Sequence, residues 1–439
     1  MELSFTARNV LAGAAILGAT GGVLGGFALL RRQSLLGDAL AHAALPGVCL
    51  GYLLTGSKTP LPLFAGALVA GIVGALVILA IVRWSRIKED VAIGIVLSVF
   101  FGVGIVLLTW IQRLPAGNQS GLDKFLFGQA ATLVDEDVRA MAILSGLVLA
   151  AVVLFYKELQ LLAFDPEFGA SLGLPMRRIE ILLTTLLVTV VVVGLQTVGV
   201  VLIVATLVTP AAAARQWTER LGAMLVLSAS IGAGSGAVGA VVSASYARLP
   251  TGPVIVLVAS AVLVVSLVAA PERGLIWALA RERRAATRIR RENLLKDLYR
   301  RGESDADWSR FVPRPHLLGE RGWTPGQLAR VLAPLGAGGL VERRDDAVRL
   351  SAAGRAEAAG VVRRHRLWEL YLARRLELAH DHVHRDAEAM EHVLSAEATE
   401  ELARQLGHPA TDPHGRPIPA AAGAGAAAGA TAPAQEAAR

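Results

Sequence analysis

Long apolar runs fill the chain up to about residue 270, and charged, amphipathic segments fill most of the remainder. A helix that crosses a bilayer needs about 20 mostly apolar residues. The runs predict nine such helices, although moving one boundary would make eight or ten. A shorter apolar segment, LDKFLFGQA at 122–130, predicts a re-entrant or interfacial helix. The nine predicted spans are residues 8–30, 37–55, 61–83, 91–111, 137–156, 179–194, 197–214, 221–245 and 252–270.

Lys and Arg residues concentrate in alternate loops. The loops after the first, third, fifth and seventh spans hold most of them, and a strongly basic segment follows the ninth span. Cytoplasmic loops of membrane proteins carry this excess of positive charge. We therefore predict a multi-pass protein of the cell inner (plasma) membrane, with its N-terminus outside and its C-terminal region in the cytoplasm.

The composition narrows the classes of partner and cofactor. Hydrophobic residues make up 54% of the chain and aromatic residues 5%, which is typical of tightly packed membrane helices. The single cysteine, Cys49, excludes a disulfide framework and a zinc site of the cysteine type. The net charge of +7 comes mostly from the Arg cluster at 281–301, for which lipid headgroups and nucleic acid are both candidate partners. Because this cluster follows an apolar helix, membrane lipid is the simpler partner.

Two ionisable residues lie inside the second predicted span. Asp38 and His42 are four residues apart, so they share one face of a helix. Charged groups in a membrane helix are costly and usually serve a transport pathway. A carboxylate with an imidazole suits Mn, Fe or Zn ions. The alternative is that Asp38 caps the helix and His42 hydrogen-bonds a neighbouring carbonyl.

The predicted cytoplasmic loop at 164–174 (FDPEFGASLGL) contains a short helix. Asp165 followed by Pro166 is a typical helix start, and Gly173 is a typical stop. A surface helix between two spans is well placed to dock a soluble partner. The alternative is a structured loop without a partner.

Several blocks of the first 275 residues resemble the ABC-type manganese/zinc/iron permeases. The blocks are RRQSLLGDALAHAALPGVCLGYLL at 31–54, FLFGQA at 125–130, FDPEFGASLGLP at 164–175, VGVVLIVATLVTPAAAAR at 198–215 and LPTGPVIVLVAS at 249–260. The resemblance implies that two permeases pair, as a homodimer or with a related chain. It also implies that an extracellular metal-binding protein delivers the ion to a site formed by Asp38 and His42, and that a cytoplasmic ATPase docks on the loop helix. The docking residues that it implies are Asp165, Pro166, Glu167, Ala170 and Gly173.

No Walker-type phosphate loop occurs in the sequence, so we expect no nucleotide site here and ATP hydrolysis on a separate subunit. The chain is thus expected to be a transport subunit and not an enzyme. The predicted fold is an all-α polytopic membrane domain at 1–275, followed by a mainly α cytoplasmic part.

The pattern after residue 275 is that of a soluble protein. Residues 281–350 have the outline of a degenerate winged helix, in which a helical segment at 323–339 precedes a short hairpin. Residues 351–419 read as a helical metal-binding and dimerisation domain. The Ala/Gly-rich residues 420–439 are predicted to be a disordered tail.

Carboxylate and imidazole side chains recur in the predicted helical domain. His365 and Glu369 are four residues apart, and Glu388, Glu391 and His392 share one helical face a few residues after His384. Such oxygen and nitrogen ligands suit Mn, Fe or Zn. The alternative is a salt-bridged surface helix.

The run from Leu350 to Pro419 resembles the iron- and manganese-dependent repressors of the diphtheria-toxin-repressor family. The matching text is LSAAGRAEAAGVVRRHRLWELYL, VHRDAEAMEHVLS and LGHPATDPHGRPIP. The primary ligands that the resemblance implies are His365, Glu388, Glu391 and His392, with Glu369 and His384 as an ancillary set. Glu388 is the manganese-type choice.

Two departures from the repressor pattern stand out. The first-helix ligand positions of the repressors fall near Asn293 and Lys296, neither of which is a good anionic ligand. The expected recognition segment, GQLARVLAPLGAGG, is poor in side chains that read base edges. DNA is therefore a weaker candidate partner than membrane lipid.

The main hypothesis is a permease for divalent transition metals, with manganese preferred over zinc and iron and with a fused domain that senses cytoplasmic metal. A second hypothesis is a membrane-tethered, metal-dependent DNA-binding regulator. A third is a permease for metal chelates, which would require a larger cavity without ionisable ligands.

Overall fold

The computed structural model describes residues 5–56, 59–114, 133–197, 199–246, 249–375, 392 and 394–421 of the 439-residue chain. The chain divides into two compact units, Met1–Ala278 and Leu279–Arg439. The predicted segment at 122–130 and almost all of the predicted tail lie outside the described residues.

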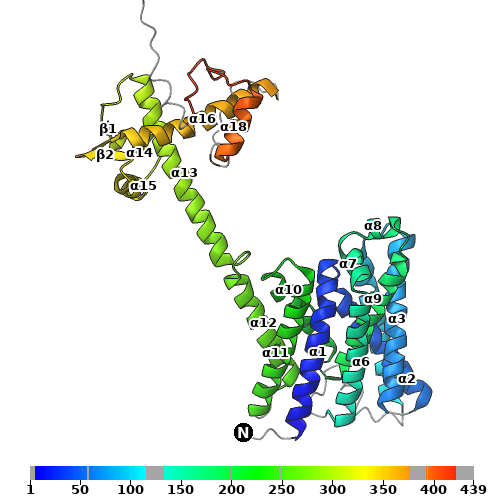
Figure 1. The fold of residues 1–439 in the computed structure, drawn as a ribbon. Coiled ribbons are helices and arrows are strands. Elements are labelled where there is room, and N and C mark those ends of the chain that lie inside the picture. The colour runs from blue at the N-terminus through cyan, green and yellow to red at the C-terminus, as the bar shows by residue number, and fades with distance from the viewer. Residues whose placement is uncertain are drawn as a thin grey trace, which may run out of the picture. The chain divides into compact units, whose positions relative to one another are not determined.

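The described part of the first unit is helical. Each of the nine predicted spans coincides with a helix (Figure 1). The helices are α1 (Phe5–Leu30), α2 (Leu36–Thr55), α3 (Pro60–Trp84), α4 (Glu89–Arg113), α6 (Asp135–Leu154), α7 (Tyr156–Phe164), α8 (Pro166–Ser171), α9 (Met176–Thr197), α10 (Val200–Arg215), α11 (Leu221–Ser245) and α12 (Thr251–Ala269).

Eight of the described helices are long and apolar enough to cross a membrane, and the predicted seventh span is not among them. That span corresponds to α10, which has 16 residues. A helix of this length rises about 24 Å, less than the roughly 30 Å of a bilayer core. The shortening has a local cause, because α9 extends to Thr197 and Gly199 then turns the chain with a φ of 82°.

Small residues bring the helices of the first unit into backbone contact. Figure 1 shows α1 (blue) beside α11 (green). A Cβ atom placed on Gly18 would lie 2.2 Å from the carbonyl oxygen of Gly232, and one on Gly22 would lie 2.5 Å from that of Ser228. Only glycine permits this approach, which is the usual way that membrane helices gain packing contacts.

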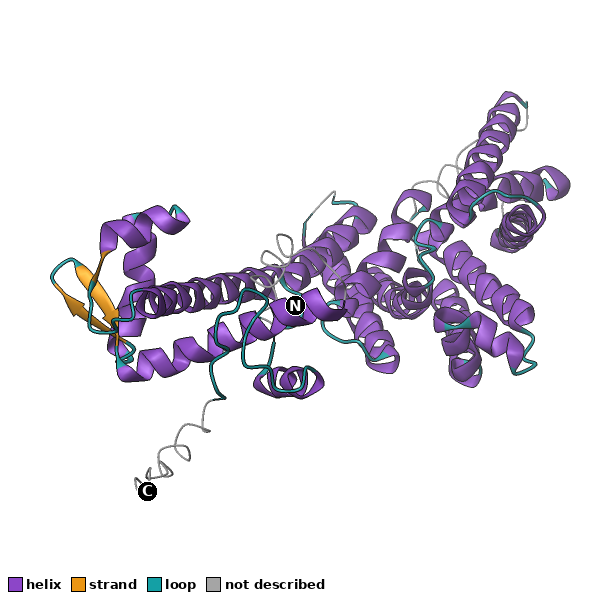
Figure 2. Cartoon of the chain, turned by 90° about the horizontal axis from the view of Figure 1, so that it is seen from above, coloured by secondary structure: helices purple, strands orange, loops and turns teal. Residues whose placement is uncertain are grey.

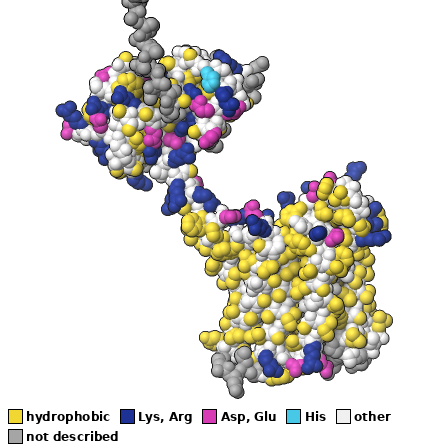
Figure 3. Space-filling model, in the orientation of Figure 1, with side chains coloured by type: hydrophobic (Ala, Val, Ile, Leu, Met, Phe, Trp, Pro, Cys, Tyr) yellow, Lys and Arg dark blue, Asp and Glu magenta, His cyan; other side chains and the backbone are white. Residues whose placement is uncertain are grey.

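The outer face of the first unit is apolar between two charged rims. Figure 3 shows hydrophobic side chains over the middle of this unit, with Lys and Arg gathered at both ends. Such a belt is what lipid-facing helices require.

The second unit contains a helix-turn-helix and a small sheet. Figure 2 shows its strands in orange, and they form one antiparallel sheet of order β1-β3-β2. The predicted winged-helix outline is thus confirmed, with α15 followed by a β2–β3 wing. The elements are α13 (Leu275–Ser304), β1 (Val312–Pro313), α14 (Arg314–Arg321), α15 (Pro325–Ala337), β2 (Val341–Arg344), β3 (Ala347–Leu350), α16 (Ala352–Arg375) and α18 (Ala396–Gln405).

Leucines of α13 connect this helix to the winged helix. Leu294, Leu295 and Leu298 are buried in one cluster with Leu328 and Leu332 of α15. The start of α15 follows from local chemistry, because the Thr324 side chain accepts a hydrogen bond from the Gln327 amide and Pro325 takes the first helical position.

Candidate metal sites

The predicted pair on α2 is close in space. Nε2 of His42 lies 3.4 Å from Oδ1 of Asp38, one turn earlier. The ring of His42 meets that of Phe101 on α4 edge to face, with centroids 4.8 Å apart. Nδ1 of His42 is buried and has no hydrogen-bond partner among the described residues. The imidazole ring is therefore held by packing, while its Nδ1 atom makes no hydrogen bond to the described residues.

The pair faces a partly open surface of α2. The side chain of Asp38 is 33% exposed and that of His42 19%, although their neighbours Ala39, Leu40 and Ala41 are fully buried. Asp38 lies in the first turn of α2, and no side chain caps this helix in the described structure. No hydrogen bond in the described structure therefore supports the alternative that Asp38 caps the helix.

The short helix predicted in the loop is α8. Oδ1 of Asp165 accepts a hydrogen bond of 2.9 Å from the amide of Phe168, and Pro166 is the first helical residue. Glu167 and Ala170 lie within the helix, and Gly173 follows it with a φ of 81°. The local geometry is therefore the predicted one.

Three apolar side chains around α8 were not among the predicted site residues. Phe164, Phe168 and Leu172 are 54%, 53% and 59% exposed. Their spacing of four residues around the Asp-Pro pair was the available signal. Exposed apolar side chains on a polar loop are typical of a docking surface.

A histidine–carboxylate pair in the second unit is deeply buried. Nε2 of His365 lies 3.2 Å from Oε1 of Glu369, and both residues are at most 2% exposed. Nη2 of Arg300 lies 2.8 Å from the same nitrogen. A guanidinium group can only donate, so Nε2 of His365 acts as the acceptor.

His392 contacts a residue that the sequence alone did not single out. Its Nδ1 lies 2.6 Å from Oε2 of Glu292 on α13, so the ring nitrogen donates to the carboxylate. Burial alone would raise the pKa of Glu292. Hydrogen bonds from His392 and Arg288 and the charges of Arg288 and Arg364 outweigh burial and lower this pKa. The sequence signal for Glu292 was that Arg288, Glu292 and Lys296 are each four residues apart, which puts them on neighbouring turns of a helix.

The predicted regulatory residues His384, Glu388 and Glu391 lie outside the described residues. Within the described part of the chain, no three His, Cys, Asp or Glu side chains are grouped so that they could hold a metal ion. The His365–Glu369 and Glu292–His392 pairs each have an arginine beside them. These described side chains alone therefore do not fit a divalent metal ion.

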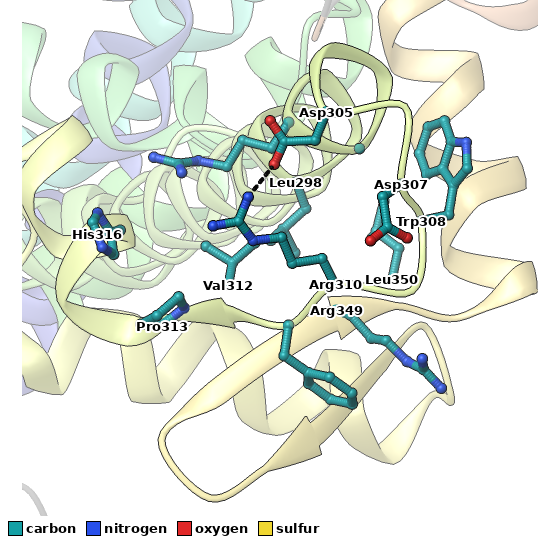
Figure 4. A pocket seen from close by; sticks show the side chains of 13 residues that line it. Leu298, Asp305, Asp307, Trp308, Arg310, Val312, Pro313, His316, Arg349 and Leu350 are labelled. Carbon is teal, nitrogen blue, oxygen red and sulfur yellow. Dashed lines mark hydrogen bonds and ion pairs between the residues drawn. The ribbon is translucent and has the colours of Figure 1, made fainter.

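A cavity of about 290 Å³ lies beside the winged helix (Figure 4). Its charged side chains are engaged with one another or with nearby residues. Arg310 pairs with Asp305 at 3.0 Å, and Arg349 pairs with Glu342 at 2.6 Å. We assign no ligand to this cavity.

Comparison with known proteins gives two family matches and several similar sequences. Residues 3–270 match the ABC 3 transport family, and residues 351–420 match the iron dependent repressor, metal binding and dimerisation domain. The chain is 44% identical over 372 residues to the manganese transport system membrane protein MntC of Bacillus subtilis, covering 84% of this chain and 85% of that protein. It is 46% identical over 282 residues to the zinc transport system membrane protein TroC of Treponema pallidum, covering 64% of this chain and 95% of that protein.

A solved structure, PsaBC from Streptococcus pneumoniae in complex with Fab, resembles the membrane part. The identity is 35%, the TM-score is 0.54, and the match covers 61% of this chain and 92% of the other. The first family model alone spans more than half of the chain. The chain therefore belongs to the ABC 3 transport family and carries a repressor-type metal-binding and dimerisation domain after its membrane helices.

Proposed function

We propose that this chain is the permease subunit of an ATP-driven importer for divalent transition-metal ions, with manganese preferred over zinc and iron. The observation that carries the proposal is the Asp38–His42 pair on α2. An oxygen and a nitrogen ligand are held within one helical turn, at the edge of an otherwise apolar bundle. Such a pair suits Mn, Zn or Fe ions as cargo.

Among the described residues, α2 supplies two such ligands at this place, and a transition-metal ion usually takes four or more. A second permease related by a two-fold axis would add the same pair. The partial exposure of Asp38 and His42 in the single chain supports this arrangement, because the open side of the pair is available to another copy. We therefore propose a homodimer or a paired permease with the ion between the two α2 helices.

Two protein partners are proposed for the membrane unit, one on its cytoplasmic side and one on its extracellular side. We propose that α8 and its apolar rim, Phe164, Phe168 and Leu172, receive a cytoplasmic ATPase. An extracellular metal-binding protein would deliver the ion from the other side. The Lys and Arg distribution supports a plasma-membrane orientation with the N-terminus outside and the second unit in the cytoplasm. This orientation needs an odd number of crossings, so we propose that the short helix α10 crosses as well and adds a ninth span to the eight long apolar helices.

The second unit is proposed to be a cytoplasmic, metal-sensing regulatory domain. Its match at 351–420 is to a metal-binding and dimerisation domain. A dimerising domain on each of two permeases would join them on the cytoplasmic side, so a change in its pairing could alter transport.

The decisive test is the metal content of cells with and without this chain, measured by mass spectrometry after growth in limiting metal. We expect manganese to fall most when the chain is deleted, and to recover when it is restored together with its ATPase. Unchanged contents of manganese, zinc and iron would contradict the proposal.

A membrane-tethered DNA-binding regulator is the second candidate. The winged-helix arrangement of α15 and the β2–β3 wing favours it, because this fold is common in DNA-binding domains. The scarcity of base-reading side chains on α15 argues against it.

A further inference from the structure

A cavity of about 740 Å³ lies beside α3 and α9, two helices of the membrane unit that pack against each other. Its polar lining is at the end of this unit where α3 ends and α9 begins, which is also the end that carries α8 (Figure 1). The remainder of its lining is apolar. The cavity therefore combines a polar end with an apolar wall.

The apolar wall is a stripe along α3. Val73, Leu76, Val77 and Ala80 line the cavity and have the spacing of one helical face. Val73 and Leu76 are each 45% exposed, so the wall is open to the outside of the membrane unit. From Val73 to Arg83 the helix rises about 15 Å, which is about half of the roughly 30 Å hydrocarbon core of a bilayer. The stripe thus has the depth of one lipid leaflet.

Two arginines at the polar end are available to an anion. Arg83 in the last turn of α3 and Arg177 in the first turn of α9 both line the cavity and are exposed. Neither guanidinium group forms an ion pair or a hydrogen bond with another described residue. Trp84, which also lines the cavity, is 78% exposed. Tryptophan and arginine at the end of an apolar stripe are typical of the level at which lipid headgroups lie.

The carboxylates in the lining already have partners. Glu180 forms an ion pair with Arg31, the third arginine of the lining. Glu89 accepts a hydrogen bond from the side chain of Gln33. The two positive charges of Arg83 and Arg177 are therefore in excess at this end of the cavity.

We propose that this cavity binds one anionic phospholipid, with its phosphate held by Arg83 and Arg177 and an acyl chain along the stripe of α3. Basic pockets beside membrane helices bind anionic headgroups through their charge. A headgroup that carries its own ammonium group would be repelled by the two guanidinium groups. A free phosphate ion would leave the apolar wall without an occupant, so its depth favours a lipid. This inference goes beyond the proposed transport function and uses only the membrane location of the helices.

The test is native mass spectrometry of the purified full-length chain in detergent. The chain is titrated with phosphatidylglycerol, which is anionic, and with phosphatidylcholine of the same acyl chains, which carries an ammonium group. Inorganic phosphate is added as a competitor in a third titration. The test variant combines Arg83→Gln with Arg177→Gln. The matched control combines Arg113→Gln with Arg139→Gln, which removes two exposed arginines at the opposite ends of helices in the same unit.

We expect the first phosphatidylglycerol molecule to bind the unsubstituted chain and the control about tenfold more tightly than phosphatidylcholine does. The Arg83/Arg177 variant should lose this preference, since each arginine near a lipid surface contributes about 1 kcal/mol. Leu76→Asn keeps both arginines and should weaken binding of either lipid severalfold, because it places an amide on the apolar wall.

Equal lipid preference in the Arg83/Arg177 variant and the control would overturn the proposal. Displacement of phosphatidylglycerol by an equal concentration of inorganic phosphate would also overturn it, since the ligand would then be a free anion. The same holds if the Arg83/Arg177 variant changes the dimer content of the spectra and leaves lipid affinity unchanged, because a second copy would then occupy the cavity. Uptake is not measured here, so failure of the proposed cargo would leave this comparison intact.

Discussion

His42 and Asp38 lie one helical turn apart on α2, with Nε2 of the imidazole 3.4 Å from Oδ1 of the carboxylate. This distance is longer than a good hydrogen bond, so the two groups are near each other without being tightly joined. A cation placed between them could be bound by the carboxylate oxygen of Asp38 and by a ring nitrogen of His42 at the same time. The proposed transport site therefore requires these two side chains to be placed near each other before the ion arrives, as they are here.

Replacing Asp38 or His42 by Ala should reduce metal uptake to the level of cells that lack the chain, because each change removes one of the two ligands. The measurement is uptake of radioactive manganese, with the amount of protein in the membrane determined by immunoblot. Asp90→Ala is a matched control, since Asp90 is also in the first turn of a helix but is exposed on α4. Uptake by the Asp38 and His42 variants equal to that of the control would contradict the proposed site.

Replacing Phe168 by Asp should weaken ATPase binding strongly, because the exposed ring at α8 would become a charge. Asp165→Ala should have a smaller effect, since loss of a helix cap costs about 1 kcal/mol. Both are measured by co-purification of the ATPase with the permease. Phe5→Asp is the control, because Phe5 is 57% exposed at the start of α1, far along the chain from α8. Undiminished co-purification of Phe168→Asp would place the ATPase elsewhere.

Replacing Gly232 by Val should destabilise the membrane unit, because its Cβ atom would lie 2.0 Å from the carbonyl oxygen of Gly18. Overpacking of this kind costs about 1–3 kcal/mol or more. The comparison variant is Gly234→Val on the same helix, where a Cβ atom would meet nothing within 4 Å. Thermal unfolding in detergent should separate the two, and equal melting temperatures would show that the α1–α11 contact is looser than described.

The turn at Asp307 should lose protection in acid. Hydrogen bonds from the hydroxyl and amide of Ser309 lower the pKa of Asp307 below its ordinary value of 3.8. Because the folded pKa is the lower one, the stabilisation is present above pH 3.8 and is lost as the pH falls through the folded value. The protection factor of the Ser309 amide in hydrogen exchange should follow this course. Asp307→Asn should remove the pH dependence, and a dependence that persists in this variant would assign it to another group.

The full-length chain in nanodiscs should bind DNA only weakly and without sequence preference, because α15 carries few side chains that read base edges. Fluorescence anisotropy at about 50 and 200 mM salt should show affinity that falls steeply with salt for all sequences alike. A metal-dependent preference for one sequence would support the DNA-binding alternative.

Local signals in the sequence predicted the elements well. Apolar runs located the membrane helices to within a few residues, and Asp165 with Pro166 located α8, because each of these signals acts over one or two helical turns. The length of α10 was overestimated, since the run of apolar residues does not reveal where Gly199 turns the chain. The nine-residue helix α7 was not predicted as a separate helix, because Lys157 and Glu158 end the apolar run of the fifth predicted span and the apolar residues that follow are too few to cross a membrane.

Contacts between residues far apart in the chain could not be predicted from the sequence. Glu292 and His392 are 100 residues apart, and nothing near either of them indicates the other. Arg300 could not be placed on His365 for the same reason. The first contact joins α13 to a turn residue far along the chain, and the second depends on how α13 and α16 meet in three dimensions. Hydrophobic periodicity specifies neither of them.

The glycine contact between α1 and α11 limits how this protein can move. Where Gly18 and Gly232 meet, no side chain stands between the helices to change rotamer, and sliding would drive one backbone into the other. We therefore expect the two helices to travel together during a transport cycle. Alternating access to the two sides of the membrane is then expected to come from movement elsewhere in the bundle.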